Sequence, residues 1–278
     1  MRVTRKEDIE KIELNLFLEA LYQRHGYDFR HYAQASVRRR VRHLLAKSGD
    51  ASISEMIPKL LYDDDFAQAA IFDFSIAVTE MFRDPDFYQS VRRNVVPYLK
   101  TYPFVKIWHA GCATGEEVYS LAILLQEEGV YDRATIFATD FNDGVLDKAK
   151  EGIYALKDIR QYTSNYQKAG GTRSFADYYH AQYELAIMNQ GLKDNITFAS
   201  HNLVTDGVFG EMHLIFCRNV LIYFDRMLQN RVLGLFADSL NYGGFLGLGS
   251  KETLQFSEVA KYFKVIDDHT KIYQKRVV

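Results

Sequence analysis

One segment limits the fold more than any other. An apolar stretch at residues 104–110, FVKIWHA, runs directly into a turn that carries Gly111 and Gly115. An apolar helical pattern over 116–128 follows at once. A strand, a glycine turn and a helix in this order form a unit whose turn lets a ligand approach the backbone and the free N–H groups of the helix. The segment therefore predicts an α/β domain with a ligand site at this turn.

The spacing of the turn excludes two familiar ligand classes. A dinucleotide fingerprint needs three glycines in the order G-x-G-x-x-G, and a phosphate loop needs Gly-Lys-Ser/Thr, whereas Gly111 and Gly115 stand alone. Glu116 and Glu117 follow directly and would repel phosphates. They suit a ligand with hydroxyl groups and a positive charge. The alternative is a tight strand–helix turn with two acids that cap the helix.

Strands and helices alternate after residue 84. Asp84-Pro85 is typical of an N-cap and first helical position, and the helix that it opens should reach Tyr98. Further strands are predicted at 135–139, 196–200, 212–217, 244–249, 263–267 and 271–276, and further helices at 142–151, 225–240 and 256–262. Such alternation predicts a mostly parallel sheet with helices on both faces. The last two strands are joined by a short turn, so they should be antiparallel.

The first 85 residues show helical patterns only, and they predict four helices. The first covers 8–24, with a periodic set of Ile9, Ile12, Leu16, Leu18 and Leu21. The second starts near Ser36 and carries the stripe Val37, Val41, Leu44 and Leu45. Ser52 and Glu55 form a capping-box pattern for the third, which contains Pro58, and the fourth covers 64–78.

These patterns predict a helical domain at 1–85 and an α/β domain at 86–278. Residues 155–195 are polar and rich in tyrosine, so they are interpreted as an inserted subdomain with short strands near 178–187.

Composition sets limits on the class of protein. The chain has 278 residues and a formal net charge of −2, which argues against nucleic-acid binding through the whole surface. Cys112 and Cys217 lie far apart without metal-ligand spacing, so no metal is expected. The charged N-terminus does not match a signal peptide, and no apolar run approaches the length of a membrane span. We expect a cytoplasmic monomer that does not insert into membranes.

Two further constellations follow predicted strands. Asp140 ends one strand, where an acid typically binds ribose hydroxyls in nucleotide-binding α/β folds. The alternative is an N-cap for the next helix, a role that Asn142 could fill. Residues 216–224, FCRNVLIYF, leave another strand at the edge where open α/β sheets bind ligands. This segment lacks the Asn/Asp-Pro-Pro-Tyr motif of enzymes that methylate the nitrogens of bases.

Together these segments resemble a known family. GCATGEEVYSLAI, ATDFNDGVLDKAKEGIY, CRNVLIYFD, GFLGLGSKE and VTEMFRDPDF are similar, in order and over nearly the whole chain, to the CheR chemotaxis-receptor methyltransferases. The resemblance implies a class I methyltransferase fold with a mostly parallel sheet, a small helical N-terminal domain and a small inserted subdomain. It implies S-adenosylmethionine (SAM) as cofactor and S-adenosylhomocysteine (SAH) as product. The implied activity is protein-glutamate O-methylation in signal transduction.

The resemblance also implies site residues. Together with Gly111 of the glycine turn, the cofactor contacts would be Thr79, Arg83, Glu117, Asp140, Asn202, Leu203, Arg218 and Asn219. Ala77 stands where the family commonly has an asparagine that contacts the cofactor. A glutamate carboxylate is ionised at neutral pH and can attack the methyl group in line without a general base. Arg83 could hold that carboxylate, and Tyr223 could donate a hydrogen bond or only pack in the core.

A basic helix is the expected docking surface. Residues 30–47 contain six bases and no acid: Arg30, Arg38, Arg39, Arg40, Arg42 and Lys47. If Val37, Val41 and Leu44 face inward, Arg39, Arg42 and His43 face outward. We interpret Arg38, Arg39 and Arg42 as contacts to an acidic helix in the cytoplasmic region of a chemoreceptor or related signalling protein. The alternative is a solvated charged face.

Two other functions stay open. The same fold could methylate a different protein or a small-molecule carboxylate. In the family, the inserted subdomain can bind a tether at the C-terminus of a receptor, and this role stays open here. A non-catalytic SAM-sensing adaptor of a signalling complex is the other alternative, although Arg83, Glu117 and Asp140 are all present.

Overall fold

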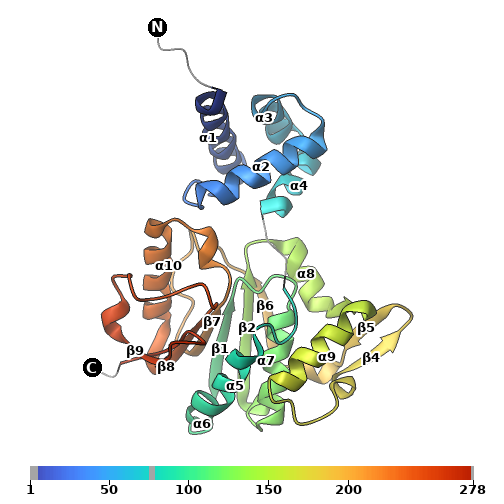
Figure 1. Cartoon of the computed structure of the whole chain (residues 1–278), viewed down its shortest axis with the longest axis vertical. Helices are drawn as coiled ribbons and strands as arrows, with labels where there is room; N and C mark the ends of the chain where they lie inside the picture. The colour runs from blue at the N-terminus through green and yellow to red at the C-terminus, as the bar shows by residue number, and fades with distance from the viewer. Residues whose placement is uncertain (1–5, 75–78, 277–278) are drawn as a thin grey trace. The chain divides into compact units, whose positions relative to one another are not determined.

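A computed structural model describes residues 6–74 and 79–276, and the chain divides into two compact units (Figure 1). The first unit comprises Met1–Ile76 with Tyr223–Gln229, and the second unit comprises Ala77–Ile222 with Asn230–Val278. The N-terminal segment of the first unit therefore ends at Ile76, whereas the predicted boundary was at residue 85.

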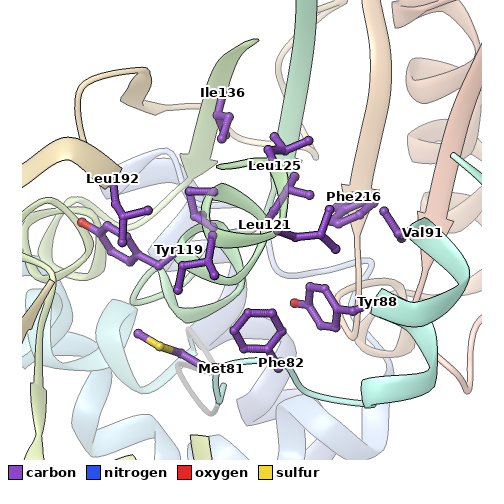
Figure 2. Close-up of a cluster of buried hydrophobic side chains, with 14 of the residues drawn as sticks. Met81, Phe82, Tyr88, Val91, Tyr119, Leu121, Leu125, Ile136, Leu192 and Phe216 are labelled. Atoms are coloured by element: carbon purple, nitrogen blue, oxygen red, sulfur yellow. The ribbon is translucent and has the colours of Figure 1, made fainter. Parts of the chain in front are cut away.

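The boundary lies earlier because the residues before Pro85 belong to the core of the second unit. Met81 and Phe82 are completely buried there. The backbone N–H of Phe82 donates a hydrogen bond to Ser120 Oγ at 2.9 Å. Figure 2 shows the Phe82 ring beside the Tyr88 ring, and their centroids are 5.0 Å apart. Arg83, which follows Phe82 directly, is therefore held at the second unit.

The first unit contains four helices in its described part: α1 (Lys6–His25), α2 (Gln34–Ser48), α3 (Ile53–Tyr62) and α4 (Asp64–Phe74). They match the four predicted helices, and the part of the fourth predicted over 75–78 lies outside the described residues. The capping box of α3 differs from expectation, because Glu55 Oε2 accepts a hydrogen bond from the N–H of Ala51 rather than Ser52.

The apolar face of α1 is rotated from the predicted one. Leu18 and Leu21 are buried, as expected, together with Leu14 and Phe17. These four positions form one inward stripe at helical spacing. Three members of the predicted stripe, Ile9, Ile12 and Leu16, are about half exposed, at 49%, 55% and 54%. Helix α1 therefore buries the face that carries Leu14 and Phe17 and leaves the face of Ile9, Ile12 and Leu16 half exposed.

Residues from far along the chain complete the first unit. The N–H of Ala33 donates to the carbonyl of Tyr223 at 2.7 Å, and the N–H of Asp225 donates to the carbonyl of His31 at 2.8 Å. The rings of Tyr32 and Phe224 pack edge to face, with centroids 5.0 Å apart. The segment Tyr223–Gln229 is therefore bound to the N-terminal helices by backbone and aromatic contacts.

The second unit is built on a seven-stranded sheet in the order β6-β2-β1-β7-β8-β10-β9. The first five of these strands are parallel, and β10 is antiparallel to both of its neighbours. Both the mostly parallel sheet and the antiparallel last pair were predicted. The strands are β1 (Val105–Ala110), β2 (Ala134–Asp140), β6 (Ile196–Ser200), β7 (Met212–Cys217), β8 (Leu240–Leu248), β9 (Phe263–Asp267) and β10 (Ile272–Lys275).

The helices beside this sheet are α5 (Pro85–Asn94), α6 (Val96–Leu99), α7 (Glu116–Glu127), α8 (Asp143–Glu151) and α10 (Arg226–Ser239). A single helix was predicted up to Tyr98, but the chain forms α5 and α6, because Pro97 has no N–H to continue the ladder. The helix predicted at 256–262 is wrong, since only a short 3-10 turn forms at Ala260–Tyr262. Asp84 is the N-cap residue of α5 and Pro85 its first residue, as predicted, but the Asp84 carboxylate pairs with Arg218 and makes no capping hydrogen bond.

The predicted insertion forms a second, antiparallel sheet in the order β3-β5-β4. Its strands are β3 (Ile153–Ala155), β4 (Tyr179–Gln182) and β5 (Leu185–Met188), and helix α9 (Ile159–Lys168) precedes β4. Helix α9 was not predicted, and its buried face carries Ile159, Tyr162, Asn165 and Tyr166. Glu127 of α7 fastens the insertion by accepting hydrogen bonds from Tyr166 Oη and Tyr178 Oη.

Candidate functional site

The glycine turn after β1 has the tight geometry that its sequence predicts. Gly111 and Gly115 have φ values of 77° and 90°, in the left-handed region that favours glycine. The N–H groups of Gly111 and Cys112 both donate to the carbonyl of Thr139, at 2.8 and 2.9 Å. The turn is therefore fixed against the end of β2, and α7 begins directly after Gly115.

Gly111 also brings two of the predicted constellations together. A Cβ atom at Gly111 would lie 2.7 Å from Cγ2 of Val220, which belongs to the loop after β7. Such a contact is too short for any side chain at position 111. The turn after β1 and the Arg218–Ile222 loop after β7 are therefore in direct contact at the carboxyl edge of the sheet.

Asp140 lies beside this turn and remains able to accept hydrogen bonds from a ligand. Its Oδ2 accepts from the N–H of Ala113 at 3.0 Å, and its Oδ1 accepts from the N–H of Asn142 at 3.1 Å. Burial raises the pKa of Asp140, and the backbone donors oppose that rise. Each carboxylate oxygen has two lone pairs, so capacity remains for hydroxyl groups. The N-cap of α8 is Asn142, which bonds the N–H of Gly144, so the capping role considered for Asp140 is already filled.

Glu117 and Arg218 form the electrostatic centre of the site. The Arg218 side chain is 1% exposed, and its Nη1 donates to Glu117 Oε2 at 2.7 Å. Its Nη2 donates to Asp84 Oδ2 at 2.8 Å and to the carbonyl of Arg83 at 3.2 Å. The guanidinium also lies 4.0 Å from the centroid of the Phe87 ring. Arg218 thereby joins α7, the loop after β7 and the residues before α5.

A buried histidine completes this network. His109 Nδ1 lies 3.4 Å from Glu117 Oε1, and the His109 side chain is 1% exposed. Burial would raise the pKa of Glu117, but the Arg218 charge and His109 outweigh it, so the pKa is lowered. Burial would likewise lower the pKa of Arg218, and Glu117, Tyr88 and Asp84 reverse the effect. Glu117 is therefore an ionised carboxylate at neutral pH.

The other predicted cofactor residues take the following positions. Asn202 and Leu203 lie in the loop after β6, where the N–H of the neighbouring His201 donates to the carbonyl of Asp140 at 3.1 Å. Asn202 Oδ1 accepts from the N–H of Val204, and Leu203 is buried. Thr79 and Arg83 are partly buried in the second unit, and Asn219 follows Arg218 with a φ of 61°. Ala77 lies outside the described residues.

The loops after β1, β2, β6 and β7 thus supply most of the predicted cofactor residues at one edge of the sheet. A pocket of about 670 Å³ opens beside the Arg218–Asp84 pair. It is lined by the start of α5, by Lys168, and by Ser250, His269 and Thr270 from the ends of β8 and the β9–β10 turn.

The remaining predicted residues belong to the first unit. The Tyr223 ring lies under the guanidinium of Arg40, 5.2 Å from centroid to Cζ. Arg39 and Arg42 are exposed on α2, and Arg38 is partly exposed. Arg42 makes a two-point ion pair with Glu10 of α1, at 2.6 and 2.8 Å. Arg40 is one of the six bases of the predicted basic helix, but it is buried and donates to the carbonyls that end α4.

Sequence comparison identifies the family. The SAM-binding domain of the CheR methyltransferases matches residues 77–272, and the all-alpha domain of the same family matches residues 12–75. The chain belongs to the CheR methyltransferase family. SAM is therefore the cofactor of the second unit, and methyl transfer is its chemistry.

Relatives match over nearly their full length. The chain is 49% identical over 264 residues to Cher3 of Pseudomonas putida, with 95% of this chain and 97% of that protein covered. It is 28% identical over 275 residues to the chemotaxis protein methyltransferase of Salmonella typhimurium, covering 95% and 91% of the two chains. It is also 28% identical over 249 residues to the chemotaxis protein methyltransferase of Listeria innocua, covering 89% and 92%.

The residues of the site fit SAM. The carboxylate of Asp140 keeps acceptor capacity for ribose hydroxyls, and the ionised Glu117 suits the positive charges of the cofactor. Arg218 Nε is buried without a hydrogen-bond partner among the described residues, which leaves one donor for a ligand acceptor. Across residues 6–74 and 79–276, the His, Cys, Asp and Glu side chains form no group able to hold a metal ion. None of the helices in these ranges is long and apolar enough to cross a membrane.

Three functional contacts were missed at the sequence level. Asp84 pairs with Arg218, His109 lies against Glu117, and Glu252 bonds the backbone of the loop after β7. Asp84 was hidden by the Asp-Pro pattern, which is typical of a helix cap. Glu252 lies within a segment that resembles the family, and His109 lies two residues before another, but the sequence alone could not show that both side chains are buried.

Proposed function

We propose that this enzyme transfers the methyl group of SAM to glutamate side chains of a chemoreceptor or a related signalling protein in the cytoplasm. The Glu117–Arg218–Asp84 network supports this function best, because it occupies both terminal nitrogens of Arg218 with carboxylates of the protein itself. We assign the acceptor carboxylate to Arg83, whose backbone carbonyl accepts a hydrogen bond from Arg218 of the same network. The names of the Salmonella typhimurium and Listeria innocua relatives support a chemotaxis partner.

The chemistry requires positioning rather than proton transfer. When bound, SAM supplies a methyl group on a positively charged sulfur, and transfer to a carboxylate oxygen leaves neutral SAH. The acceptor glutamate is already ionised at neutral pH, so the protein need not remove a proton. Arg83 orients that carboxylate through paired N–H donors. Asp140 and Arg218 hold the cofactor in a fixed position relative to the acceptor. Holding the reacting groups in line can contribute roughly 7–11 kcal/mol to the rate enhancement.

The role of Tyr223 is narrower than that of Arg83. Its ring stacks with Arg40, and its carbonyl accepts from Ala33, so its backbone and ring are fixed within the first unit. We infer that Tyr223 contributes to methyl transfer through its hydroxyl group. Tyr223→Phe keeps the stacking and removes the hydroxyl, so the variant should lower kcat while leaving thermal stability unchanged.

The docking surface is proposed on α2. Arg30, Arg40, Arg42 and Lys47 are engaged with Asp28, the end of α4, Glu10 and Asp73 respectively. Arg38 and Arg39 are the members of the basic set for which the described residues show no ion pair. They carry most of the proposed attraction for an acidic receptor helix, and Arg42 can exchange Glu10 for an acid of the partner.

The function is tested by transfer of a labelled methyl group from SAM to purified receptor fragments, with base lability as the mark of an ester. Arg83→Ala should reduce transfer by at least about 100-fold, because misplaced acceptors lose that order of rate. The matched control is Arg93→Ala, an exposed arginine on α5, which should transfer like the wild type. Full activity of Arg83→Ala would contradict the role of Arg83, and base-stable label would contradict the ester.

A further inference from the structure

Glu252 is a buried acid whose bonds are directed at backbone rather than at charged side chains. It lies four residues after the end of β8 and is 4% exposed. Its Oε2 accepts hydrogen bonds from the N–H of Gly249 at 2.6 Å and from the N–H of Asn219 at 3.0 Å. Its Oε1 accepts from the N–H of Ile222 at 3.2 Å. One carboxylate therefore ties the loop after β7 to the turn after β8.

The loop that Glu252 binds is under local constraint. Asn219 has a φ of 61°, in the left-handed region, which is uncommon for residues other than glycine and which asparagine adopts at a lower cost than most. Backbone in this region persists only where its surroundings hold it. The N–H of Asn219 is one of the groups that Glu252 bonds. The acid thus acts directly on the residue whose conformation needs support.

The turn after β8 is shaped to bring the carboxylate to this loop. A Cβ atom at Gly249 would lie 2.8 Å from the backbone N of Asn219 and 2.8 Å from Glu252 Oε2. Only glycine leaves room for this approach. The N–H of Glu252 donates back to the carbonyl of Gly249 at 2.9 Å, which closes the turn.

The Glu252 carboxylate binds the backbone N–H groups of the two segments better than a neutral side chain would. Burial raises the pKa of Glu252, and the backbone donors oppose that rise, so ionisation here carries a desolvation cost. A carboxylate presents only acceptors, and its two oxygens can serve donors on both sides. A glutamine would turn its NH₂ group toward one set of N–H donors and leave them without an acceptor.

We propose that Glu252 is a positioning residue for methyl transfer. By holding the N–H groups of Asn219 and Ile222, it fixes the loop from which Arg218 and Asn219 face the cofactor. The same loop places Val220 against Gly111 of the glycine turn, so its position also affects the turn. The inference rests on the cofactor roles proposed for Arg218 and Asn219.

The test compares Glu252→Gln with wild type in the full chain, using SAH titration by calorimetry and steady-state transfer. The variant removes the same charge as Glu258→Gln, its matched control, which changes an exposed acid six positions later. Because Glu252→Gln leaves backbone donors of the Arg218–Ile222 loop without their acceptor, we expect SAH affinity to fall by about tenfold or more in this variant. The control should bind like the wild type.

NMR shifts of backbone amides distinguish a general loss of stability from a local loss of positioning by Glu252. In labelled protein, the amide protons of Gly249, Asn219 and Ile222 should shift upfield in Glu252→Gln, while amides of β1 and β2 keep their positions. If Glu252→Gln does not fold, Gly249→Ala serves instead, because its methyl group would push against Asn219 and the carboxylate. Gly249→Ala should weaken SAH binding in the same way.

The outcomes distinguish two failures. If wild type binds SAH and Glu252→Gln, or Gly249→Ala in its place, binds equally well, the positioning role of Glu252 is wrong and the cofactor site stands. If wild type itself does not bind SAH, the proposed cofactor roles of Arg218 and Asn219 fail first. An affinity loss accompanied by shifts throughout the sheet would also overturn the positioning role.

Discussion

At the scale of single residues, Glu116 should make stability depend on pH. Burial raises its pKa to about 7, from an ordinary 4.5, while Thr114 opposes the rise through a hydrogen bond at 2.7 Å. Because the folded state binds this proton more tightly than the unfolded state, the free energy of unfolding falls as pH rises from about 4.5 to about 7. Above that range the buried charge costs about 3 kcal/mol.

Glu116→Gln is neutral at every pH and can still accept the Thr114 hydrogen bond through its carbonyl. We expect the variant to melt at a higher temperature than wild type near pH 8 and at a similar temperature near pH 5. Thermal unfolding of both proteins without cofactor measures the difference. An equal difference in melting temperature at the two pH values would show that ionisation of Glu116 does not cause the difference.

The Glu117–Arg218 pair should behave as one unit. Arg218→Met leaves Glu117 buried without its main partner, and breaking a buried pair in this way costs about 3–5 kcal/mol. Glu117→Gln removes the charge that would be stranded, so the double variant should be more stable than the sum of the single losses. Denaturant unfolding of the wild type, the two single variants and the double variant gives the coupling free energy between Glu117 and Arg218. Additive losses would mean that the two side chains do not interact.

At the scale of elements, the segment before α5 is the support of the site. Phe82 is fully buried and packs against Tyr88 and Tyr166, with centroids 5.0 and 5.2 Å away. Phe82→Ala should cost about 3–5 kcal/mol. It should also weaken SAH binding, because Arg83 is its direct neighbour.

The matched control is Phe236→Ala, which empties an equally buried position on α10 against Trp108. It should lose a similar free energy of unfolding, measured by denaturant titration, but keep SAH affinity measured by calorimetry. Equal losses of affinity in the two variants would show that the segment before α5 has no special role in the site.

The regular elements of the second unit could be predicted because their signals are local. The predicted strands 196–200, 212–217 and 263–267 coincide with β6, β7 and β9, since each is a short apolar run bounded by turn residues. Helix α9 was missed because its buried face is made largely of tyrosine and asparagine, which do not give an apolar stripe. The rotated face of α1 was missed because Ile9, Ile12 and Leu16 also have helical spacing.

The site could be predicted in part. Gly111, Asp140 and Arg218 follow strands, and topology brings the carboxyl ends of parallel strands to one edge. The contacts of Asp84, His109 and Glu252 depend on side chains that meet across sequence separations of 8 to 134 residues or on buried backbone donors. No local pattern encodes such contacts, so they require the folded structure.

At the scale of the whole molecule, the two units carry separate tasks in our account. The second unit holds the methyl donor, and α2 of the first unit attracts the acceptor protein. Charge reversal at Arg38 and Arg39 should raise KM for a receptor fragment, with little change in SAH affinity or kcat. The effect should weaken at high salt, since exposed charges are screened within about 10 Å at 0.1 M.

The control for this prediction is Lys264→Glu, which reverses one exposed charge on β9 of the second unit. It should leave KM for the receptor fragment near the wild-type value. If Arg38→Glu with Arg39→Glu leaves KM unchanged, α2 is a solvated charged face and not the docking surface.

The chemical identity of the modified residue shows whether the enzyme forms methyl esters on glutamate. Receptor fragments incubated with the enzyme and SAM would be digested and sequenced by mass spectrometry. We predict a mass gain of one CH₂ group on glutamate side chains, removed by mild base and absent when Arg83→Ala replaces the wild type. Methylation on lysine, arginine or a backbone position, or a gain that resists base, would contradict the account.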